Sequence, residues 1–237
     1  LGAPDERVTS GELSEFTEVK FGELNVMILV RKPDVPDRPR QMEGRRIFGN
    51  PDDLFLQSKP KRGLLTNSET RVIALAELDL GPTSIVWDIG AGSGSVALEA
   101  AQLAPEGHVF AVEMDTDDFE LIRQNADRFR LHNVTPVLGR APEAWEDLPI
   151  PDAIFVGGTG RQAATIVEQA IGRLKSGGRI VVDMASIENL QAVQAVMRQA
   201  TGDVNILMIN VSRGNYQLES LRFDALTPKF VLSAVKP

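Results

Sequence analysis

The segment that decides the fold is IVWDIGAGSGS, residues 85–95. Its first five residues are mostly apolar and β-branched, which is typical of a buried parallel strand. The glycines that follow allow a sharp turn and the close approach of a ligand to the backbone. Residues 96–103 continue as a helix, whose first turn presents free N–H groups. The segment therefore predicts a strand, a glycine turn and a helix that together bind a small molecule.

The spacing of the glycines indicates which small molecule. The dinucleotide fingerprint is G-x-G-x-x-G, but here the third glycine comes one residue early, and Asp88 stands two residues before the first. This D-x-G-x-G-x-G order resembles motif I of the S-adenosylmethionine (SAM) methyltransferases, in which the loop and an acidic residue hold the methionine end. Glu113 ends the next predicted strand, where a carboxylate can accept both ribose hydroxyls. The alternative is a tight strand-to-helix turn with a solvated Asp88.

Composition bounds the class of protein. The 237 residues are 43% hydrophobic and 24% charged, which is ordinary for a globular chain of one large domain, or of one domain plus a fragment. The lack of cysteine excludes disulfides, zinc–thiolate sites and thiol nucleophiles, and two histidines argue against a His-based metal site. We see no signal peptide and no apolar run of membrane-spanning length, so we expect a cytoplasmic protein without membrane contact. A net charge of −8 argues against a nucleic-acid partner.

Strands and helices alternate from residue 85 onward, which predicts an α/β fold: a mostly parallel seven-stranded sheet with helices on both faces. The expected strands are residues 85–89, 108–113, 134–138, 153–156, 179–183, 204–211 and 230–235. The expected helices are residues 66–78, 96–103, 116–129, 162–174 and 188–200. In such sheets ligands bind at the carboxyl ends of the strands, where Asp88, Glu113, Arg140 and Gly157 all fall.

The amino-terminal part reads differently. We expect a short helix over residues 12–20, a buried-type strand over 24–30 and a proline-rich linker to residue 51, with a domain boundary near residue 50. The sequence therefore predicts two parts, residues 1–50 and a main domain over residues 51–237. Two helix starts are also predicted: Thr66 with Glu69 as a capping box, and Thr116 as the cap of the helix over 116–129.

Loops after the later strands supply further candidates. Arg140 and Ala141 lie where adenine could be flanked, although a plain connection would look similar. The glycines of residues 157–160 either bring backbone close to a large planar ligand or simply free the loop. Four basic residues are candidate contacts for an anionic substrate or, alternatively, ordinary surface charges: Lys61, Arg62, Arg161 and Arg213.

Four stretches together resemble one family: residues 65–71, 86–96, 139–143 and 151–160 are similar to the CbiT-type precorrin methyltransferases of cobalamin biosynthesis. These form the carboxy-terminal half of the fused, decarboxylating C5,15-methyltransferases. The likeness covers residues 50–237, and the Ala-Pro-Glu and Asp-x-x-Phe-x-Gly-Gly loops carry it. Two departures are Thr159, where the family has Ser, and Asn67, where it often has Lys.

The resemblance implies a Rossmann-like class I SAM-dependent methyltransferase fold and a polycarboxylate tetrapyrrole substrate. The reaction would be methylation at C15 with loss of the C12 acetate carboxylate and release of S-adenosylhomocysteine. The implied SAM-binding residues are Thr66, Asp88, Gly90, Ala91, Gly92, Ser93, Gly94, Glu113, Met114, Arg140, Ala141 and Gly157. The implied substrate-binding residues are Lys61, Arg62, Gly158, Thr159, Gly160, Arg161 and Arg213.

The resemblance also implies partners. Residues 1–31 resemble the tail of a preceding tetrapyrrole methylase domain that methylates C5, and family members assemble as tetramers. Three other functions stay open: a tRNA adenine N1-methyltransferase, a non-catalytic SAM-binding module and an NAD-dependent dehydrogenase. The acidic charge disfavours the first and the glycine spacing disfavours the third.

Overall fold

The computed structural model describes residues 7–22, 25–30, 45–58, 65–217 and 220–237. The chain divides into two compact units, Leu1–Pro39 and Arg40–Pro237. The larger unit thus begins about ten residues before the expected boundary. Within the described residues, no helix is long and apolar enough to span a membrane.

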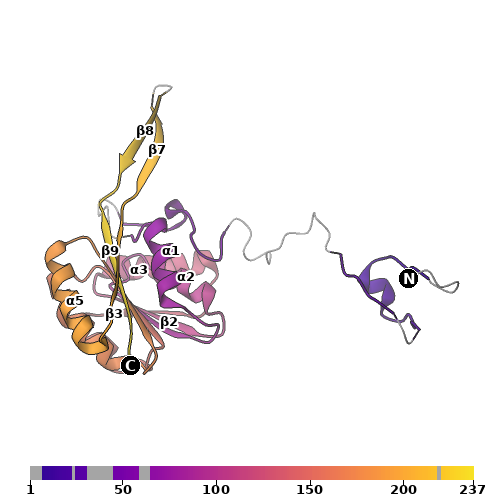
Figure 1. Cartoon of the computed structure of the whole chain (residues 1–237), viewed down its shortest axis with the longest axis horizontal. Coiled ribbons are helices and arrows are strands. Elements are labelled where there is room, and N and C mark those ends of the chain that lie inside the picture. Colours follow the sequence, from indigo (N-terminus) through magenta and orange to yellow (C-terminus); the bar gives the residue numbers. More distant parts are fainter. Residues whose placement is uncertain (1–6, 23–24, 31–44, 59–64, 218–219) are drawn as a thin grey trace. The chain divides into compact units, whose positions relative to one another are not determined.

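The larger unit is built on a seven-stranded sheet in the order β3-β2-β1-β4-β5-β9-β6 (Figure 1). The first five of these strands are parallel, and β9 runs antiparallel to both of its neighbours. This confirms the predicted mostly parallel sheet. The strands are β1 (Ile85–Ile89), β2 (His108–Glu113), β3 (Val134–Leu138), β4 (Ala153–Val156), β5 (Arg179–Met184), β6 (Asn205–Ile209) and β9 (Lys229–Val235).

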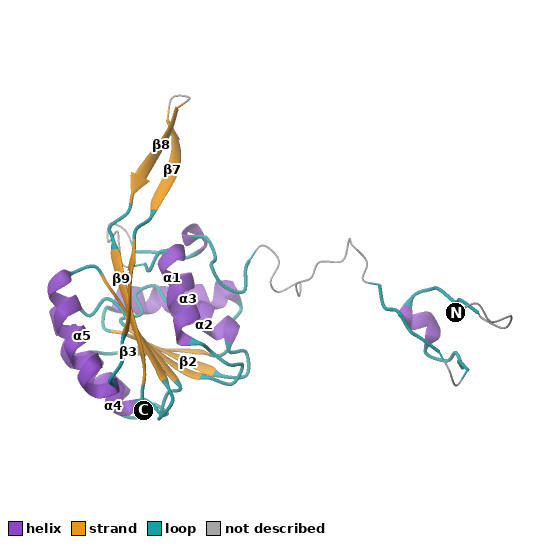
Figure 2. Cartoon of the chain, viewed as in Figure 1, coloured by secondary structure: helices purple, strands orange, loops and turns teal. Residues whose placement is uncertain are grey.

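Five helices cover the two faces of the sheet (Figure 2). Alternate strand residues point to opposite faces, so each face has its own apolar core. The core on one face joins Val86, Phe155 and Val181 to helices α1, α2 and α3. The core on the other face joins Trp87, Ile154 and other strand residues to helices α4 and α5. The helices are α1 (Ser68–Leu78), α2 (Ser95–Leu103), α3 (Thr116–Phe129), α4 (Ala163–Arg173) and α5 (Ile187–Thr201).

Two predicted helix caps are wrong by one residue. The side chain of Asn67, not Thr66, accepts a hydrogen bond from the Thr70 N–H at the start of α1. Asp115, not Thr116, caps α3 by accepting from the backbone N–H groups of residues 117 and 118. In both places a neighbouring Asx side chain, one residue after Thr66 and one residue before Thr116, reaches orphan N–H groups that a hydroxyl could also satisfy.

The connection between β6 and β9 contains a β-hairpin that the sequence analysis did not predict. Strands β7 (Ser212–Gln217) and β8 (Ser220–Ala225) pair with each other as a separate two-stranded sheet. The ribbon projects from the sheet edge in Figure 1. Its described residues are all exposed. The burial alternation that would have marked these strands is therefore missing.

The smaller unit differs from its prediction. The expected helix over residues 12–20 is reduced to a 3-10 turn, η1 (Leu13–Phe16). The expected strand over 24–30 is wrong for residues 25–30, which form no regular structure; Leu24 lies outside the described residues. Residues 26–30 are 63–89% exposed. An apolar run forms a strand only when a partner strand satisfies its backbone, and the described part of this unit offers none.

Candidate functional site

The glycine loop between β1 and α2 makes a backbone cradle at the carboxyl edge of the sheet. Gly90 has φ +74°, and a Cβ built on it would lie 2.0 Å from the carbonyl oxygen of Gly157 at the end of β4. Gly94 has φ +84°, and a Cβ there would meet the Leu98 side chain at 2.7 Å. Glycine is required at both positions because the backbone is left-handed and the neighbours are close. The chain leaves β1 for α2 on one face of the sheet and leaves β4 for α4 on the other face. The loop thus lies at the switch point between these two strands, where α/β sheets bind ligands.

Glu113, at the end of β2, ties this cradle to the next strand. Its Oε2 accepts from the Gly92 N–H at 2.8 Å. Its Oε1 accepts from the N–H groups of Met114 and Asp115 at 2.8 and 2.9 Å. A carboxylate has about four acceptor positions and three are used here, so Glu113 keeps capacity for about one hydroxyl of a ligand.

Asp88 is held under the glycine loop. It is 1% exposed, and its Oδ2 accepts from the Ala97 N–H in the first turn of α2 at 2.9 Å. Burial raises its pKa to about 7, against the bond from Ala97, and the Glu113 charge adds to the rise. Its Oδ1 is buried and, among the described residues, has no hydrogen-bond partner; the same holds for Ser93 Oγ in the loop.

These features fit a zwitterionic, nucleoside-bearing cofactor such as SAM. Two unpaired buried oxygens, Asp88 Oδ1 and Ser93 Oγ, supply acceptors beside backbone N–H groups. Glu113 supplies a carboxylate at the neighbouring strand end. Between them the backbone of Gly90 and Gly94 has positive φ and leaves no room for a Cβ. A methionine ammonium and ribose hydroxyls are groups that such donors and acceptors can satisfy.

Other predicted residues surround the cradle. Met114 is 67% exposed directly after Glu113, which leaves an apolar surface beside the cradle. Arg140 follows β3 and donates to Gln162 Oε1 at 2.6 Å, linking the loops that follow β3 and β4. In the loop after β4, Gly158 and Gly160 have positive φ, and the Gly160 carbonyl accepts from Asn189 of α5 at 2.9 Å. Thr159 and Arg161 lie in this loop, and Ala141 follows Arg140.

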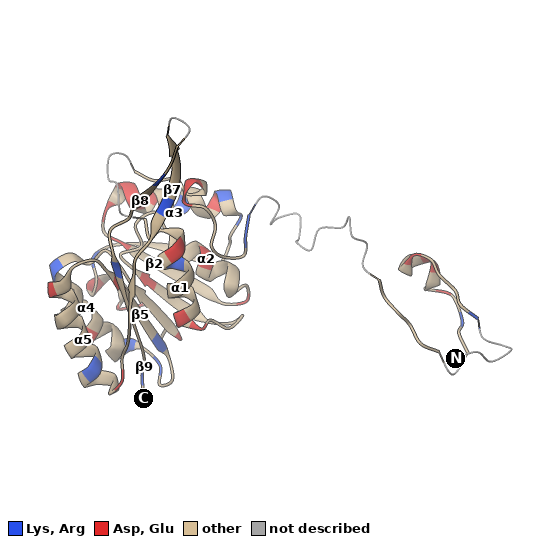
Figure 3. Cartoon of the chain, turned by 45° about the horizontal axis from the view of Figure 1, so that its top comes forward, with Lys and Arg blue, Asp and Glu red and all other residues tan. Residues whose placement is uncertain are grey.

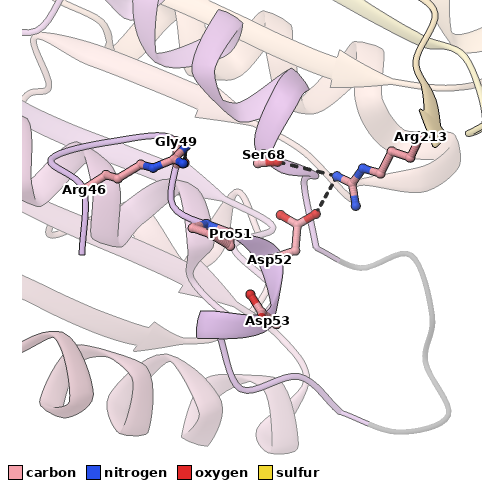
Figure 4. Close-up of a pocket in the computed structure, with 7 residues that line it drawn as sticks. All are labelled: Arg46, Gly49, Pro51, Asp52, Asp53, Ser68 and Arg213. Carbon is pink, nitrogen blue, oxygen red and sulfur yellow. Dashed lines mark hydrogen bonds and ion pairs between the residues drawn. The ribbon is translucent and has the colours of Figure 1, made fainter. Parts of the chain in front are cut away.

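Arg213, predicted as a free anion contact, is already paired. It donates to Glu69 Oε2 at 2.6 Å and to Asp52 Oδ2 at 2.9 Å. These hydrogen bonds, Glu69's first, hold the pKa of Arg213 above its ordinary value. Figure 4 shows its guanidinium directed at Asp52 and Ser68 across a surface pocket of about 410 Å³. A substrate carboxylate would therefore have to compete with two protein carboxylates for this residue.

A buried ionic cluster, not predicted from the sequence, adjoins this pocket. Arg71 of α1 and Glu99 of α2 are both 0% exposed, with Arg71 Nε 3.2 Å from Glu99 Oε2. Glu99 also accepts from the N–H groups of Gly49 and Asn50 at 2.8 and 2.7 Å. This cluster anchors the segment that leads into α1, the helix in whose first turn Ser68 and Glu69 lie. Nothing in the local sequence of either helix indicates that these two charges would meet.

A second ion pair that was not predicted joins Asp183, near the carboxyl end of β5, to Lys229, at the start of β9. An acidic residue at the end of a predicted strand was the signal used for Asp88 and Glu113. The same signal marks Asp183 and would have found it. Thr66 lies before α1, and its carbonyl accepts from the Arg71 guanidinium. Lys61 and Arg62 lie outside the described residues. No group of three or more His, Cys, Asp or Glu able to hold a metal occurs in the part of the chain that the structure describes.

The sheet order, the antiparallel β9 and the glycine cradle with its two acidic residues define a Rossmann-like class I methyltransferase fold. A profile of the precorrin methyltransferase domain matches residues 60–227. The chain therefore belongs to the precorrin methyltransferase domain family, and the resemblance seen in the sequence is confirmed. Membership of a methyltransferase family implies the use of SAM.

Individual relatives agree with this assignment. A probable cobalt-precorrin-6B C(15)-methyltransferase (decarboxylating) of Pyrobaculum calidifontis is 34% identical over 188 residues, covering 78% of this chain and 95% of that protein. A precorrin-6Y C(5,15)-methyltransferase [decarboxylating] of a Sinorhizobium species is 34% identical over 192 residues, covering 79% of this chain but only 43% of that protein. This chain therefore matches less than half of the longer, C5,15-type relative.

Solved structures give the same result. The precorrin-6Y C5,15-methyltransferase of Geobacter metallireducens superposes with a TM-score of 0.75 at 34% identity, covering 81% of this chain and all of that chain. The tRNA (m1A58) methyltransferase TrmI of Aquifex aeolicus superposes with a TM-score of 0.63 at 16% identity. The second likeness is one of fold alone.

Proposed function

We propose that this chain transfers a methyl group from SAM to C15 of a precorrin macrocycle and removes the carboxylate of its C12 acetate arm, in cobalamin biosynthesis. The observation that carries the proposal is the cradle of Gly90, Asp88 and Glu113 at the switch point of the sheet, in a chain of the precorrin methyltransferase domain family. Relatives whose names state this reaction support it.

The proposed cofactor site uses the loop and the two strand ends. Asp88 and Ser93, with the loop N–H groups, would hold the methionine end, and Glu113 the ribose. Met114 and the Arg140–Ala141 turn would border the adenine, and Thr66 and Gly157 would complete the site. SAM, when bound, supplies an electrophilic methyl group. The chain's own contribution to methylation is orientation, which contributes up to ~7–11 kcal/mol when two reacting groups are held in line.

The proposed substrate site lies on the other side of the switch point. Gly158, Thr159 and Gly160 supply backbone and a hydroxyl, and Arg161 is an exposed cation in the same loop. Arg213 is a weaker candidate than the sequence suggested, because Glu69 and Asp52 occupy its guanidinium. Lys61 and Arg62 remain proposed contacts for the many carboxylates of the macrocycle.

The test is an anaerobic incubation of the chain with methyl-labelled SAM and the reduced precorrin-6 substrate, followed by mass spectrometry. We expect a product with one labelled methyl group more and one carboxyl group less. An unchanged macrocycle, with SAM binding measured by calorimetry, would leave a SAM-binding module as the better description. Methylated tRNA in a parallel incubation would favour the tRNA methyltransferase instead. That alternative is disfavoured by the net charge of −8. Basic and acidic positions are interspersed along the ribbon in Figure 3.

Partners follow from the same proposal. Residues 1–31 would be the remnant of a preceding C5-methylating domain, followed by a linker to residue 50, since the Sinorhizobium relative is more than twice as long as the matched region. A homo-oligomer, proposed as a tetramer, would cover the exposed apolar hairpin residues Tyr216, Leu221 and Phe223. A cytoplasmic location goes with the proposal, because SAM is a cytoplasmic metabolite.

A further inference from the structure

Asp183 and Lys229 form a largely buried ion pair at the carboxyl edge of the sheet. Lys229 Nζ lies 3.1 Å from Asp183 Oδ2, and the two side chains are 23% and 5% exposed. Asp183 Oδ1 is buried and has no hydrogen-bond partner among the described residues. Of the two groups, the ammonium is therefore the one that a bound ligand can reach from the rim.

The strand register places this pair beside the substrate half of the site. Val156 at the end of β4 pairs with Val182 of β5, so the next residues along, Gly157 and Asp183, come level with each other. Asp183 in turn pairs with Val231 of β9, two residues after Lys229. The pair thus lies across β4 from the cofactor cradle, level with Gly157, where the loop of the proposed substrate site begins.

Stability alone does not explain a pair in this position. Burying two charges usually costs as much as their attraction returns, and an unpaired buried oxygen adds to the cost. Burial raises the pKa of Asp183 above its ordinary value, although the Lys229 ammonium opposes the shift. A buried carboxyl group with a raised pKa and an unsatisfied oxygen, at the edge of the sheet where ligands bind, is typical of a catalytic site.

We propose that Lys229 is the acid of the decarboxylation step and that Asp183 is the residue that positions it. This inference rests on the proposed function. The bond between the acetate methylene and its carboxylate breaks, carbon dioxide leaves, and the electron pair passes into the conjugated macrocycle. The electron pair then returns to the exocyclic carbon, which takes a proton from the Lys229 ammonium and becomes a methyl group. Solvent restores the proton to Lys229.

Asp183 has a second effect in this arrangement. An acetate carboxylate that approaches the Lys229 ammonium also approaches the Asp183 carboxylate, whose Oδ2 lies 3.1 Å from the same nitrogen. The repulsion between the two carboxylates disappears when the arm departs as neutral carbon dioxide. The Asp183–Lys229 ion pair therefore attracts the acetate arm through the ammonium and supplies the proton. It also favours departure of the carboxylate as neutral carbon dioxide.

The test compares two substitutions of Lys229. Lys229→Arg keeps the positive partner of Asp183, but a guanidinium does not give up its proton, whereas Lys229→Met removes both charge and proton. The control is Lys175→Met, because Lys175 and Asp152 also form a Lys–Asp pair, 2.6 Å apart but 47% and 36% exposed, at the amino ends of β4 and β5. Substrate and SAM affinities are measured by calorimetry, and methyl transfer and carbon dioxide release are followed separately in single turnovers.

We expect both Lys229 variants to release carbon dioxide ~10²–10⁴-fold more slowly, the usual effect of losing a positioned acid. Methyl transfer and SAM affinity should match Lys175→Met, so the product gains its methyl group and keeps its carboxylate. Carbon dioxide release by Lys229→Arg at the wild-type rate would overturn the inference. So would equal loss of both steps with substrate affinity unchanged. If the wild type performs neither step, the proposed function itself fails.

Discussion

At the scale of single residues, Gly90 is the cradle position that we expect to tolerate substitution least. Gly90→Ala places a methyl group 2.0 Å from a backbone oxygen in a left-handed conformation. We expect it to lower the free energy of unfolding by roughly 1–3 kcal/mol and to abolish SAM binding. Urea denaturation and calorimetry measure the two effects.

The matched control is Gly172→Ala in α4. A Cβ there meets nothing within 4 Å. Helix propensity favours alanine, so this variant should be as stable as the wild type or more stable by about 1 kcal/mol. If Gly90→Ala bound SAM as the control does, the cradle would not be the cofactor site.

Asp88 should make stability depend on pH. Its pKa is raised from 3.8 to about 7 in the folded chain, mainly by burial. Between these values the folded state binds more protons than the unfolded state, so stability falls as pH rises, by up to about 1.4 kcal/mol per pH unit. Above pH 7 the effect levels off. Asp88→Asn should flatten this slope, as measured by urea denaturation across the window. The exposed Asp147→Asn should leave the slope as it is.

At the scale of elements, the buried Arg71–Glu99 pair joins α1, α2 and the segment before them. Arg71→Met leaves the Glu99 charge buried without its cation, so we expect a loss of roughly 3–5 kcal/mol in the free energy of unfolding. The amides of Gly49 and Asn50, which donate to Glu99, should exchange hydrogen faster. Arg179→Met is the control, since the Arg179 and Asp79 side chains are 37% and 73% exposed. It should change stability by less than about 1 kcal/mol. Equal losses in the two variants would contradict a structural role for the buried pair.

At the scale of the whole molecule, the β7–β8 ribbon has one apolar face and one polar face. Tyr216 pairs with Leu221 and Gly214 with Phe223, which places these side chains on the same face. Tyr216, Leu221 and Phe223 are 50–78% exposed. A lone two-stranded ribbon is marginally stable in water, so we expect a second copy of the chain to cover this face.

Phe223→Ser should therefore lower the molar mass found by light scattering at a given concentration. Arg222→Ser, on the polar face of the same strand, should leave the assembly unchanged. If Phe223→Ser assembled as well as the wild type, the hairpin would not be the contact between copies.

The sequence by itself determined the sheet and its cofactor edge. Local patterns are sufficient there: buried strands such as 85–89 are mostly apolar, the glycines of the cradle have positive φ, and Glu113 ends a strand by its place in the chain. Family membership followed from the same segments. Capping was right in principle and wrong by one residue, because neighbouring polar side chains can reach the same N–H groups.

Only the tertiary structure decided which distant charges meet. Arg213 and Glu69 are 144 residues apart in the chain, and Asp183 and Lys229 are 46 apart. No local pattern encodes such pairs, since they depend on how the sheet edge, α1 and the hairpin come together. The hairpin was missed because none of its described residues is buried, and the strand predicted over residues 24–30 was wrong for 25–30 because no strand among the described residues pairs with it. Periodicity reports burial, and burial belongs to the assembled structure.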